Sequence, residues 1–189
     1  MKKILSIVSV LLALVMMLSS VSVLAYGEEG PDVLEKQVGK FWYYTEGRKT
    51  DKKGNKYFVG PVGIMDYTGK AKNVKIPSKI DGFKVDRVDF SYLRGFEEYN
   101  KRLSVIKSIE IPTSIIYVNL TCSKKIEKIT LKHKKKAPKF MFYNGDFKNK
   151  KSGIKFYVKN KKVAKSLKKQ LKNSGAKRPK IYIGKKLYK

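Results

Sequence analysis

Few residues in this chain are of the types that enzymes use for chemistry. In the middle of the chain two pairs of acids stand close together, Asp86 with Asp89 and Glu97 with Glu98. Paired carboxylates across a cleft perform glycoside hydrolysis, but nothing in the sequence holds either pair across a cleft. The chain also lacks a phosphate-binding loop, a G-x-S-x-G nucleophile elbow and an H-E-x-x-H zinc motif. A hydrolase is therefore the least supported functional hypothesis, and we expect no catalytic residues.

The single histidine and the single cysteine limit metal and redox chemistry further. They exclude a His-rich metal centre, a multi-cysteine metal site and an intramolecular disulfide. His133 stands among lysines in Lys132–Lys136, which would lower its pKa and repel a metal cation, so we interpret it as a solvated loop residue. For Cys122 we favour a buried small side chain over a reactive thiol. We expect no metal and no cofactor.

Lysine is the polar residue that stands out, and it is concentrated in the last third of the chain. Tyr26–Leu120 has 17 basic and 13 acidic residues, a net +4, whereas Thr121–Lys189 has 25 basic and 2 acidic residues, a net +23. Such a surface suits a polyanion such as teichoic acid, an acidic glycan, an anionic lipid surface or extracellular DNA. The alternative is a solvated lysine surface without a ligand, as an AT-rich genome would favour.

The kind of basic residue also bears on the partner. The chain has 39 Lys and 5 Arg. Lysine is a point charge without the bidentate fork that reads guanine, so we expect no sequence-specific recognition of nucleic acid.

One predicted helix, from about Lys161 to Lys172, holds the best-ordered lysines. Asn160 is placed to cap it, and Val163, Leu167 and Leu171 recur every four residues on one apolar face. That small face is expected to pack as a lid rather than to lie on a membrane. On the opposite face we place four candidate polyanion-binding residues: Lys161, Lys165, Lys168 and Lys172.

Strands are predicted on both sides of this helix, at Ile154–Val158 and Ile181–Ile183. A strand–helix–strand connection of this length implies a right-handed parallel crossover. We therefore expect a C-terminal β-α-β cap.

The middle of the chain repeats an apolar triplet. The three copies are Ala71-x-x-Val74-x-Ile76, Ile106-x-x-Ile109-x-Ile111 and Ile126-x-x-Ile129-x-Leu131. The last two copies are offset by 20 residues at every apolar position (106/126, 109/129 and 111/131), and prolines follow the first two. This spacing predicts stacked parallel strands, with Ile109, Ile111, Ile129 and Leu131 buried and Glu110 on the opposite face.

These segments resemble a known family. Tyr67–Val88, and Ile109–Ile115 with Cys122 before Ile126–Leu131, look like units of the BspA-type leucine-rich repeat proteins, which are secreted or surface proteins of bacteria and some protozoa. The usual Ala-Phe pair is missing; Tyr92-Leu93 stands near its place. The resemblance implies an α/β fold, a short leucine-rich repeat solenoid with stacked parallel strands. It also implies binding and adhesion, without shared catalytic residues.

The N-terminal segment has the pattern of a secretory signal peptide. Lys2 and Lys3 precede an apolar run, and Val23 and Ala25 are the small residues that signal peptidase requires. We predict cleavage between Ala25 and Tyr26. The mature protein is then expected to be extracellular, either free or associated with the cell wall, and to have no integral membrane segment.

The start of the mature chain is expected to form a β-hairpin cap. Gly27–Lys40 is interpreted as a polar leader, and Phe41–Thr45 and Tyr57–Val59 as two antiparallel strands around a polar loop. Ile64–Tyr67 would continue the second strand. The predicted organisation is a signal peptide at 1–25, a leader and hairpin cap at 26–66, repeats at 67–140, and the basic cap at 141–189.

Two main functional hypotheses follow. The first is a secreted, non-enzymatic leucine-rich repeat module that contacts host or cell-surface molecules. The second is a wall-associated scaffold held by electrostatic binding to anionic polymers. In either case the expected partner is an extracellular protein, a glycan or an anionic wall polymer, and the protein is expected to act as a monomer. Exposed strand residues such as Lys75 and Glu110 are further contact candidates.

Overall fold

The computed structural model describes residues 34–45, 47–91, 101, 103–121, 123, 125–141, 153–173 and 179–189. All of them belong to the unit Asp32–Lys189. The predicted signal peptide with its cleavage site at Ala25 and Tyr26 lies outside the described residues. So do Cys122 and the acid pair Glu97 and Glu98.

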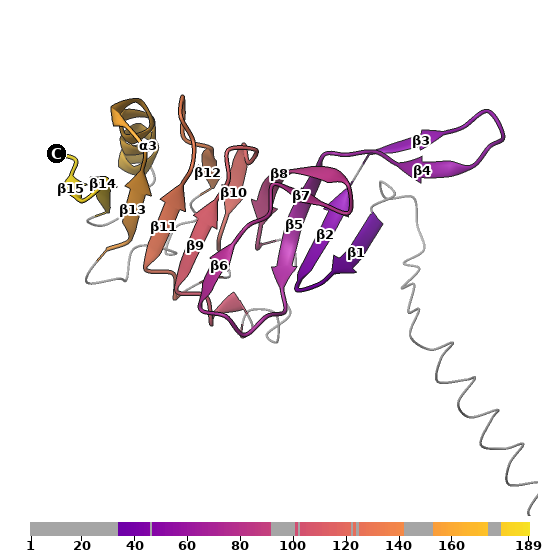
Figure 1. The fold of residues 1–189 in the computed structure, drawn as a ribbon, viewed down its shortest axis with the longest axis horizontal. Coiled ribbons are helices and arrows are strands. Elements are labelled where there is room, and N and C mark those ends of the chain that lie inside the picture. The colour runs from indigo at the N-terminus through magenta and orange to yellow at the C-terminus, as the bar shows by residue number, and fades with distance from the viewer. Residues whose placement is uncertain are drawn as a thin grey trace, which may run out of the picture. The chain divides into compact units, whose positions relative to one another are not determined.

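The fold is mixed α/β and rich in sheet, with parallel strands and one helix among the described residues. One sheet has six strands in the order β15-β14-β13-β11-β9-β6. In chain order they are β6 (Asn73–Lys75), β9 (Ser108–Ile111), β11 (Lys128–Leu131), β13 (Lys155–Val158), β14 (Lys180–Ile183) and β15 (Lys186–Leu187). Figure 1 shows β6, β9, β11 and β13 running side by side.

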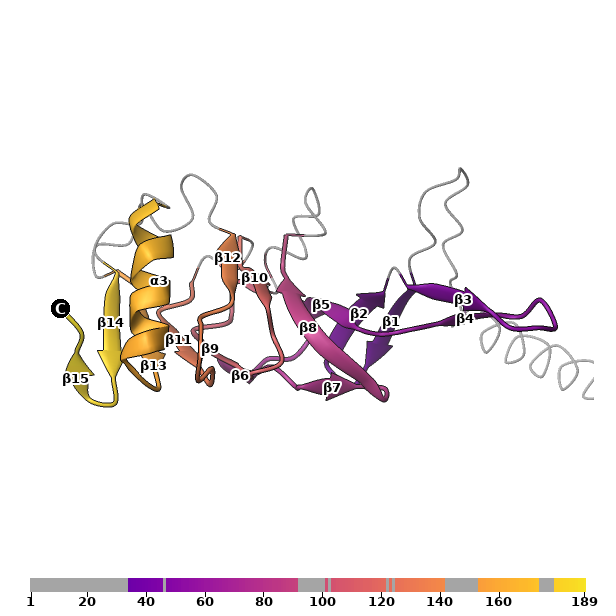
Figure 2. The ribbon, with the colours of Figure 1, turned by 90° about the horizontal axis from the view of Figure 1, so that it is seen from above.

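The other large sheet has seven strands. Its order is β1-β2-β5-β8-β10-β12, with β7 paired to β8. These strands are β1 (Leu34–Val38), β2 (Phe41–Thr45), β5 (Val62–Tyr67), β7 (Lys79–Ile80), β8 (Phe83–Asp89), β10 (Tyr117–Asn119) and β12 (Lys139–Met141). From β6 to β13 the chain passes back and forth between the two sheets, and each return adds a parallel neighbour (Figure 2).

The core forms where apolar residues of the two sheets meet. Strand residues alternate in direction, so every second side chain points inward. Phe156 of β13 meets Phe140 of β12 edge-on, with ring centroids 5.8 Å apart. The buried set includes Val74, Ile109, Ile111, Ile129, Leu131 and Val158 from one sheet and Val85, Val88 and Val118 from the other.

The predicted register of the middle strands is confirmed. Ile109 pairs with Ile129, and Ile111 with Leu131, in the parallel pair β9–β11. All four side chains are buried, while Glu110 between them is half-buried. Ile106 and Ile126, three residues before Ile109 and Ile129, are buried as well. The offset of the sequence pattern thus corresponds to the step from one strand to its neighbour.

The N-terminal pairing differs from the prediction. Phe41–Thr45 does not pair with the segment near Tyr57; β2 lies antiparallel between β1 and β5. β1 falls within Gly27–Lys40, which the sequence analysis interpreted as a leader. The strand near Tyr57, β4 (Lys56–Phe58), instead pairs with β3 (Arg48–Thr50) as a separate two-stranded hairpin. The composition of these segments did not reveal which strands pair, because strand pairing depends on contacts between residues that are distant in sequence.

The C-terminal part contains the predicted strand–helix–strand unit. β13 and β14 are parallel, and α3 (Lys161–Asn173) connects them. Figure 2 shows α3 beside β13 and β14. β15 then turns back antiparallel to β14 after Gly184, whose φ is +60°, a conformation that favours glycine. No helix in the described part of the chain is long and apolar enough to cross a membrane.

Candidate anion-binding surface

Helix α3 is anchored by its apolar side. Val163, Ala164 and Leu167 are fully buried, and Leu171 is 4% exposed. The Asn160 side-chain Oδ1 accepts a hydrogen bond from the Val163 N–H at 3.1 Å, so Asn160 is the predicted N-cap. The four candidate lysines, Lys161, Lys165, Lys168 and Lys172, are all exposed.

Several lysines of α3 destabilise the helix electrostatically. Its first turn contains no acidic residue and holds Lys161 and Lys162, at the end where the helix dipole is positive. Lysines four residues apart, such as Lys161 and Lys165, repel each other. The helix is therefore stabilised by its buried face, and an anion near its first turn would relieve the repulsion among the lysines there.

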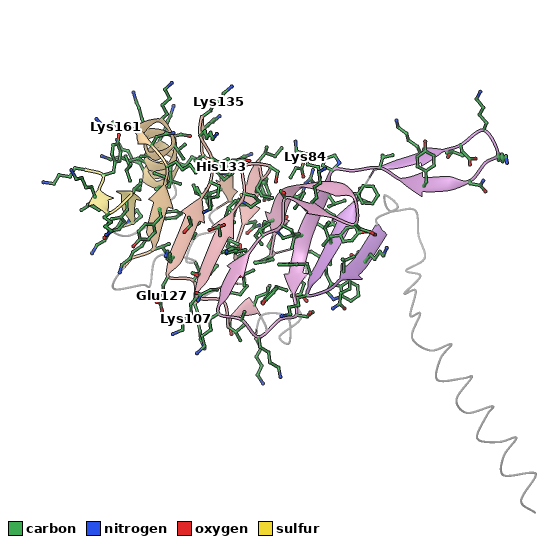
Figure 3. The ribbon with its side chains drawn as sticks, viewed as in Figure 1. Lys84, Lys107, Glu127, His133, Lys135 and Lys161 are labelled. Atoms are coloured by element: carbon green, nitrogen blue, oxygen red, sulfur yellow. The ribbon has the colours of Figure 1, made fainter. Side chains whose placement is uncertain are left out.

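A second basic segment lies beside the start of α3. The Nδ2 of Asn160 donates a hydrogen bond to the Lys134 carbonyl oxygen at 2.8 Å, so one side chain both caps the helix and holds the 132–136 loop. Figure 3 shows Lys135 and Lys161 at the same end of the strands. Lys134, Lys135 and Lys136 are exposed. The sequence analysis treated this loop and the helix separately, because nothing local shows that Asn160 joins them.

His133 is not the solvated residue that was predicted. It is 7% exposed, and its Nε2 lies 2.7 Å from the Ile115 carbonyl oxygen. Since a carbonyl only accepts, Nε2 carries the proton, and the buried Nδ1 has no hydrogen-bond partner among the described residues. Burial lowers the pKa of His133 below its ordinary value, and the bond to Ile115 offsets part of that effect. His133 is thus a neutral anchor for the basic loop.

Two of the four exposed lysines, Lys168 and Lys172, lie beside the C-terminal segment. The Lys168 Nζ lies 5.7 Å from the centroid of the Tyr188 ring, a cation–π contact with the C-terminal segment. Lys168, Lys172 and Lys180 line a groove of about 390 Å³ with an apolar floor that includes Leu171 and Ile181. Within the stripe formed by the four candidate lysines, these two therefore share a groove with a lysine of β14.

A larger groove, of about 900 Å³, lies on the other side of α3. Three lysines line it, Lys136, Lys139 and Lys169, together with His133 and Gln170. The Gln170 side chain accepts a hydrogen bond from the Phe140 N–H at 2.9 Å and donates one to the Pro138 carbonyl at 3.0 Å. Lysines thus line grooves on both sides of the helix, an arrangement suited to binding anions.

Carboxylates in the first part of the chain already have partners. Asp81 forms an ion pair with Lys36 and accepts a hydrogen bond from the Tyr43 hydroxyl at 2.9 Å. These bonds lower the pKa of Asp81, while burial and the neighbouring carboxylate raise the pKa of Tyr43 to about 12. Glu110 pairs with Lys132 at 2.9 Å. The described carboxylates therefore do not neutralise the lysines of α3 through any ion pair that the structure shows.

The acid pair Asp86 and Asp89 is not assembled for acid–base chemistry. The two residues are three apart on β8, so their side chains point to opposite faces of the strand. Asp86 accepts a hydrogen bond from the Arg87 Nε at 3.2 Å, and Asp89 accepts one from the Ser91 hydroxyl at 2.6 Å. In the described ranges, no three residues among His, Cys, Asp and Glu gather into a metal-binding group.

Comparison of the chain with protein-family models, with curated proteins and with solved structures finds no match.

Proposed function

We propose that this protein is an extracellular, non-enzymatic leucine-rich repeat module that binds anionic molecules at a cell surface through its basic last third. The observation that carries the proposal is the joining of two lysine segments, the 132–136 loop and α3, by the side chain of Asn160. Such a tie holds the lysines of both segments close together in a folded surface, rather than leaving them as separate charged runs.

The electrostatics supports the same function. The last third carries 25 basic residues against 2 acidic ones. Like charges along α3 and cations at its N-terminus cost stability. A bound polyanion would relieve both costs, and release of its counterions would favour binding. A lysine surface of this kind would tolerate many sequences and sugars, because lysine contacts charge rather than base edges.

The repeat class is supported by the way the chain alternates between two sheets. Each return adds one parallel strand, and the 20-residue offset of the apolar triplets matches one such step. Stacking of this kind is how repeat proteins bury side chains that one unit cannot bury alone. The helix at one end and the antiparallel strands at the other would then act as caps.

Salt dependence tests this function. The purified full-length chain should bind a polyanion such as duplex DNA or teichoic acid with an affinity that falls log-linearly with salt concentration. With roughly four phosphate contacts the slope on duplex DNA would be near −3.6. The variant K161Q/K165Q/K168Q/K172Q should flatten this slope. Binding that is insensitive to salt, or unchanged in the variant, would contradict the proposal and favour a lysine surface without a ligand.

A wall-associated scaffold is the second candidate, favoured by the exposure of all four lysines of the stripe. In that case charge alone holds the protein, so washing whole cells with salt should release it completely. An adhesion module that contacts a specific molecule should retain a fraction that salt does not elute.

A further inference from the structure

The outer face of the six-stranded sheet carries a second basic feature. Lys128, Lys155 and Lys180 are direct neighbours in the register of β11, β13 and β14. All three are exposed. They form a row that crosses the strands, with one lysine on each strand and a spacing of about 4.8 Å between strands. We call these three residues the lysine row.

The lysine row is unfavourable for the sheet by itself. Like charges directly opposite each other on neighbouring strands are destabilising. None of the three lysines forms an ion pair with a carboxylate in the described part of the chain. On β9 and β6, the positions in line with the lysine row are Ser108 and Asn73. These two neutral side chains pair with each other, since the Ser108 hydroxyl donates a hydrogen bond to the Asn73 side chain at 2.6 Å.

Hydroxyl-bearing side chains form a parallel row two residues further along the same strands. Thr130, Tyr157 and Tyr182 are neighbours in the same register, and each is half-buried. We call them the hydroxyl row. Because residues two apart point to the same face, this row lies alongside the lysine row, about 7 Å away along the strands.

The two aromatic rings of the hydroxyl row already contact each other. Tyr157 and Tyr182 stack with centroids 5.1 Å apart and an interplanar angle of 15°. The Lys128 Nζ lies 4.9 Å from the centroid of Tyr157. These contacts use ring faces that nucleobases would need for stacking, so the face does not suit single-stranded nucleic acid. The rings are instead held as a rigid support for their hydroxyl groups.

We infer that this sheet face binds a linear acidic polysaccharide that lies across β11, β13 and β14. Such a polymer carries a carboxylate on each ring and hydroxyl groups along the rest of it, which matches a row of ammonium groups beside a row of hydroxyl groups. The three lysines are one strand spacing apart, so a chain that lies across the strands passes each of them in turn. Charge-assisted hydrogen bonds would form to the lysine row, and neutral ones to the hydroxyl row.

This inference names a ligand class for the proposed function and rests on that function's binding of polyanions. It also places the contact at the opposite end of the strands from the 132–136 loop and from Lys161, although Lys180 shares a groove with Lys168 and Lys172. Lys128, Lys155 and Lys180 lie at the amino ends of their strands, whereas the 132–136 loop follows the carboxyl end of β11. Figure 3 shows Glu127, next to Lys128 in sequence, at the opposite end of the strands from His133, Lys135 and Lys161.

The test compares three variants of the full-length chain by calorimetric binding to purified oligogalacturonate. K128Q/K155Q/K180Q should lower the affinity by roughly tenfold or more, since three charged contacts are lost. T130V/Y157F/Y182F should lower it by roughly threefold to tenfold while keeping every charge. K49Q/K52Q/K53Q removes the same charge from the β3–β4 hairpin and should change it little. Arginine at the three row positions should restore binding.

Two further ligands make the result specific. Binding of inorganic polyphosphate should be weakened by the lysine-row variant but not by the hydroxyl-row variant, and binding of oligothymidylate should be changed little by either. Equal binding of oligogalacturonate by the lysine-row and hairpin variants would overturn the inference. So would a hydroxyl-row variant that binds oligogalacturonate normally. If only K161Q/K165Q/K168Q/K172Q loses affinity, the proposed function stands and this inference fails; if the unmodified protein binds no polyanion, the proposed function fails.

Discussion

The side chain of Gln170 occupies the position of a neighbouring strand at the edge of the seven-stranded sheet. Its Oε1 accepts from the Phe140 N–H at 2.9 Å, and its Nε2 donates to the Pro138 carbonyl at 3.0 Å. β12 is the last strand in that sheet order, so one amide group satisfies backbone groups that would otherwise be exposed at the edge. An unpaired edge is a template for association with another chain.

Replacing Gln170 should therefore affect both stability and association. Q170A is expected to lower the free energy of unfolding by about 1–2 kcal/mol, because two backbone groups lose their partner. It should also increase self-association, measured by sedimentation velocity. Q170E keeps the acceptor for Phe140 but loses the donor to Pro138, so its stability should be intermediate. A Q170A protein that is monomeric and as stable as the wild type would show that the edge does not need this cover.

Substitutions at Ile111 and Glu110 test which side chains of β9 point into the core. I111D places a charge in the core between the sheets and should cost more than about 3 kcal/mol in urea unfolding. E110Q removes only the half-exposed ion pair with Lys132 and should cost under about 1 kcal/mol. Similar unfolding midpoints for the two variants would mean that the inward and outward faces have been assigned wrongly.

His133 should make stability depend on pH. Its folded pKa is lowered by burial, so the unfolded chain binds more protons at mildly acidic pH. Its contribution is complete above the unfolded pKa of about 6.5 and is lost as the pH falls from there toward the folded pKa. Urea unfolding at pH 7.5 and 5.5 measures this loss. H133Q retains a donor for Ile115 but cannot titrate, and it should show a flat profile; the same slope in both proteins would exclude His133 as its source.

Asn160 has two roles that different substitutions separate. N160A removes the helix cap and should cost about 1 kcal/mol. N160S keeps a capping oxygen, so the unfolding free energy should stay close to the wild-type value, but it loses the donor to the Lys134 carbonyl. Amide hydrogen exchange in the 132–136 loop should accelerate in both variants. Unchanged exchange in N160S would show that the bond to Lys134 does not hold the loop.

Glu127 is an exposed carboxylate beside the lysine row. E127Q removes its repulsion of a polyanion and should raise the affinity for oligogalacturonate roughly twofold to fivefold at low salt. E35Q makes the same charge change on β1 and serves as the control. An equal gain in both variants would mean that net charge, rather than the position beside the row, controls binding.

Local patterns in the sequence were enough to predict some features of this structure. Alternation along a strand is a property of the backbone, so the burial of Ile109 and Ile111 follows from their spacing. The same holds for α3, where Val163, Leu167 and Leu171 recur on one face and Asn160 supplies the cap. The net positive charge of the last third follows directly from the numbers of its basic and acidic residues.

The pairing of strands was decided only by the tertiary structure. Phe41–Thr45 is recognisably β-prone, yet its neighbours are β1 and β5 rather than the nearby β4. Hydrogen-bonded ladders join residues that are far apart in sequence, so their partners depend on which faces can be buried together.

The environment of individual polar residues was likewise beyond local patterns. His133 stands in a run of lysines, but the chain folds it against the Ile115 carbonyl, 18 residues earlier. Lys128, Lys155 and Lys180 are scattered over 53 positions, and only the parallel register aligns them with one another. Composition determined that this protein carries excess positive charge; the stacking of parallel strands decided which lysines lie side by side, because neighbouring strands place distant residues within one strand spacing.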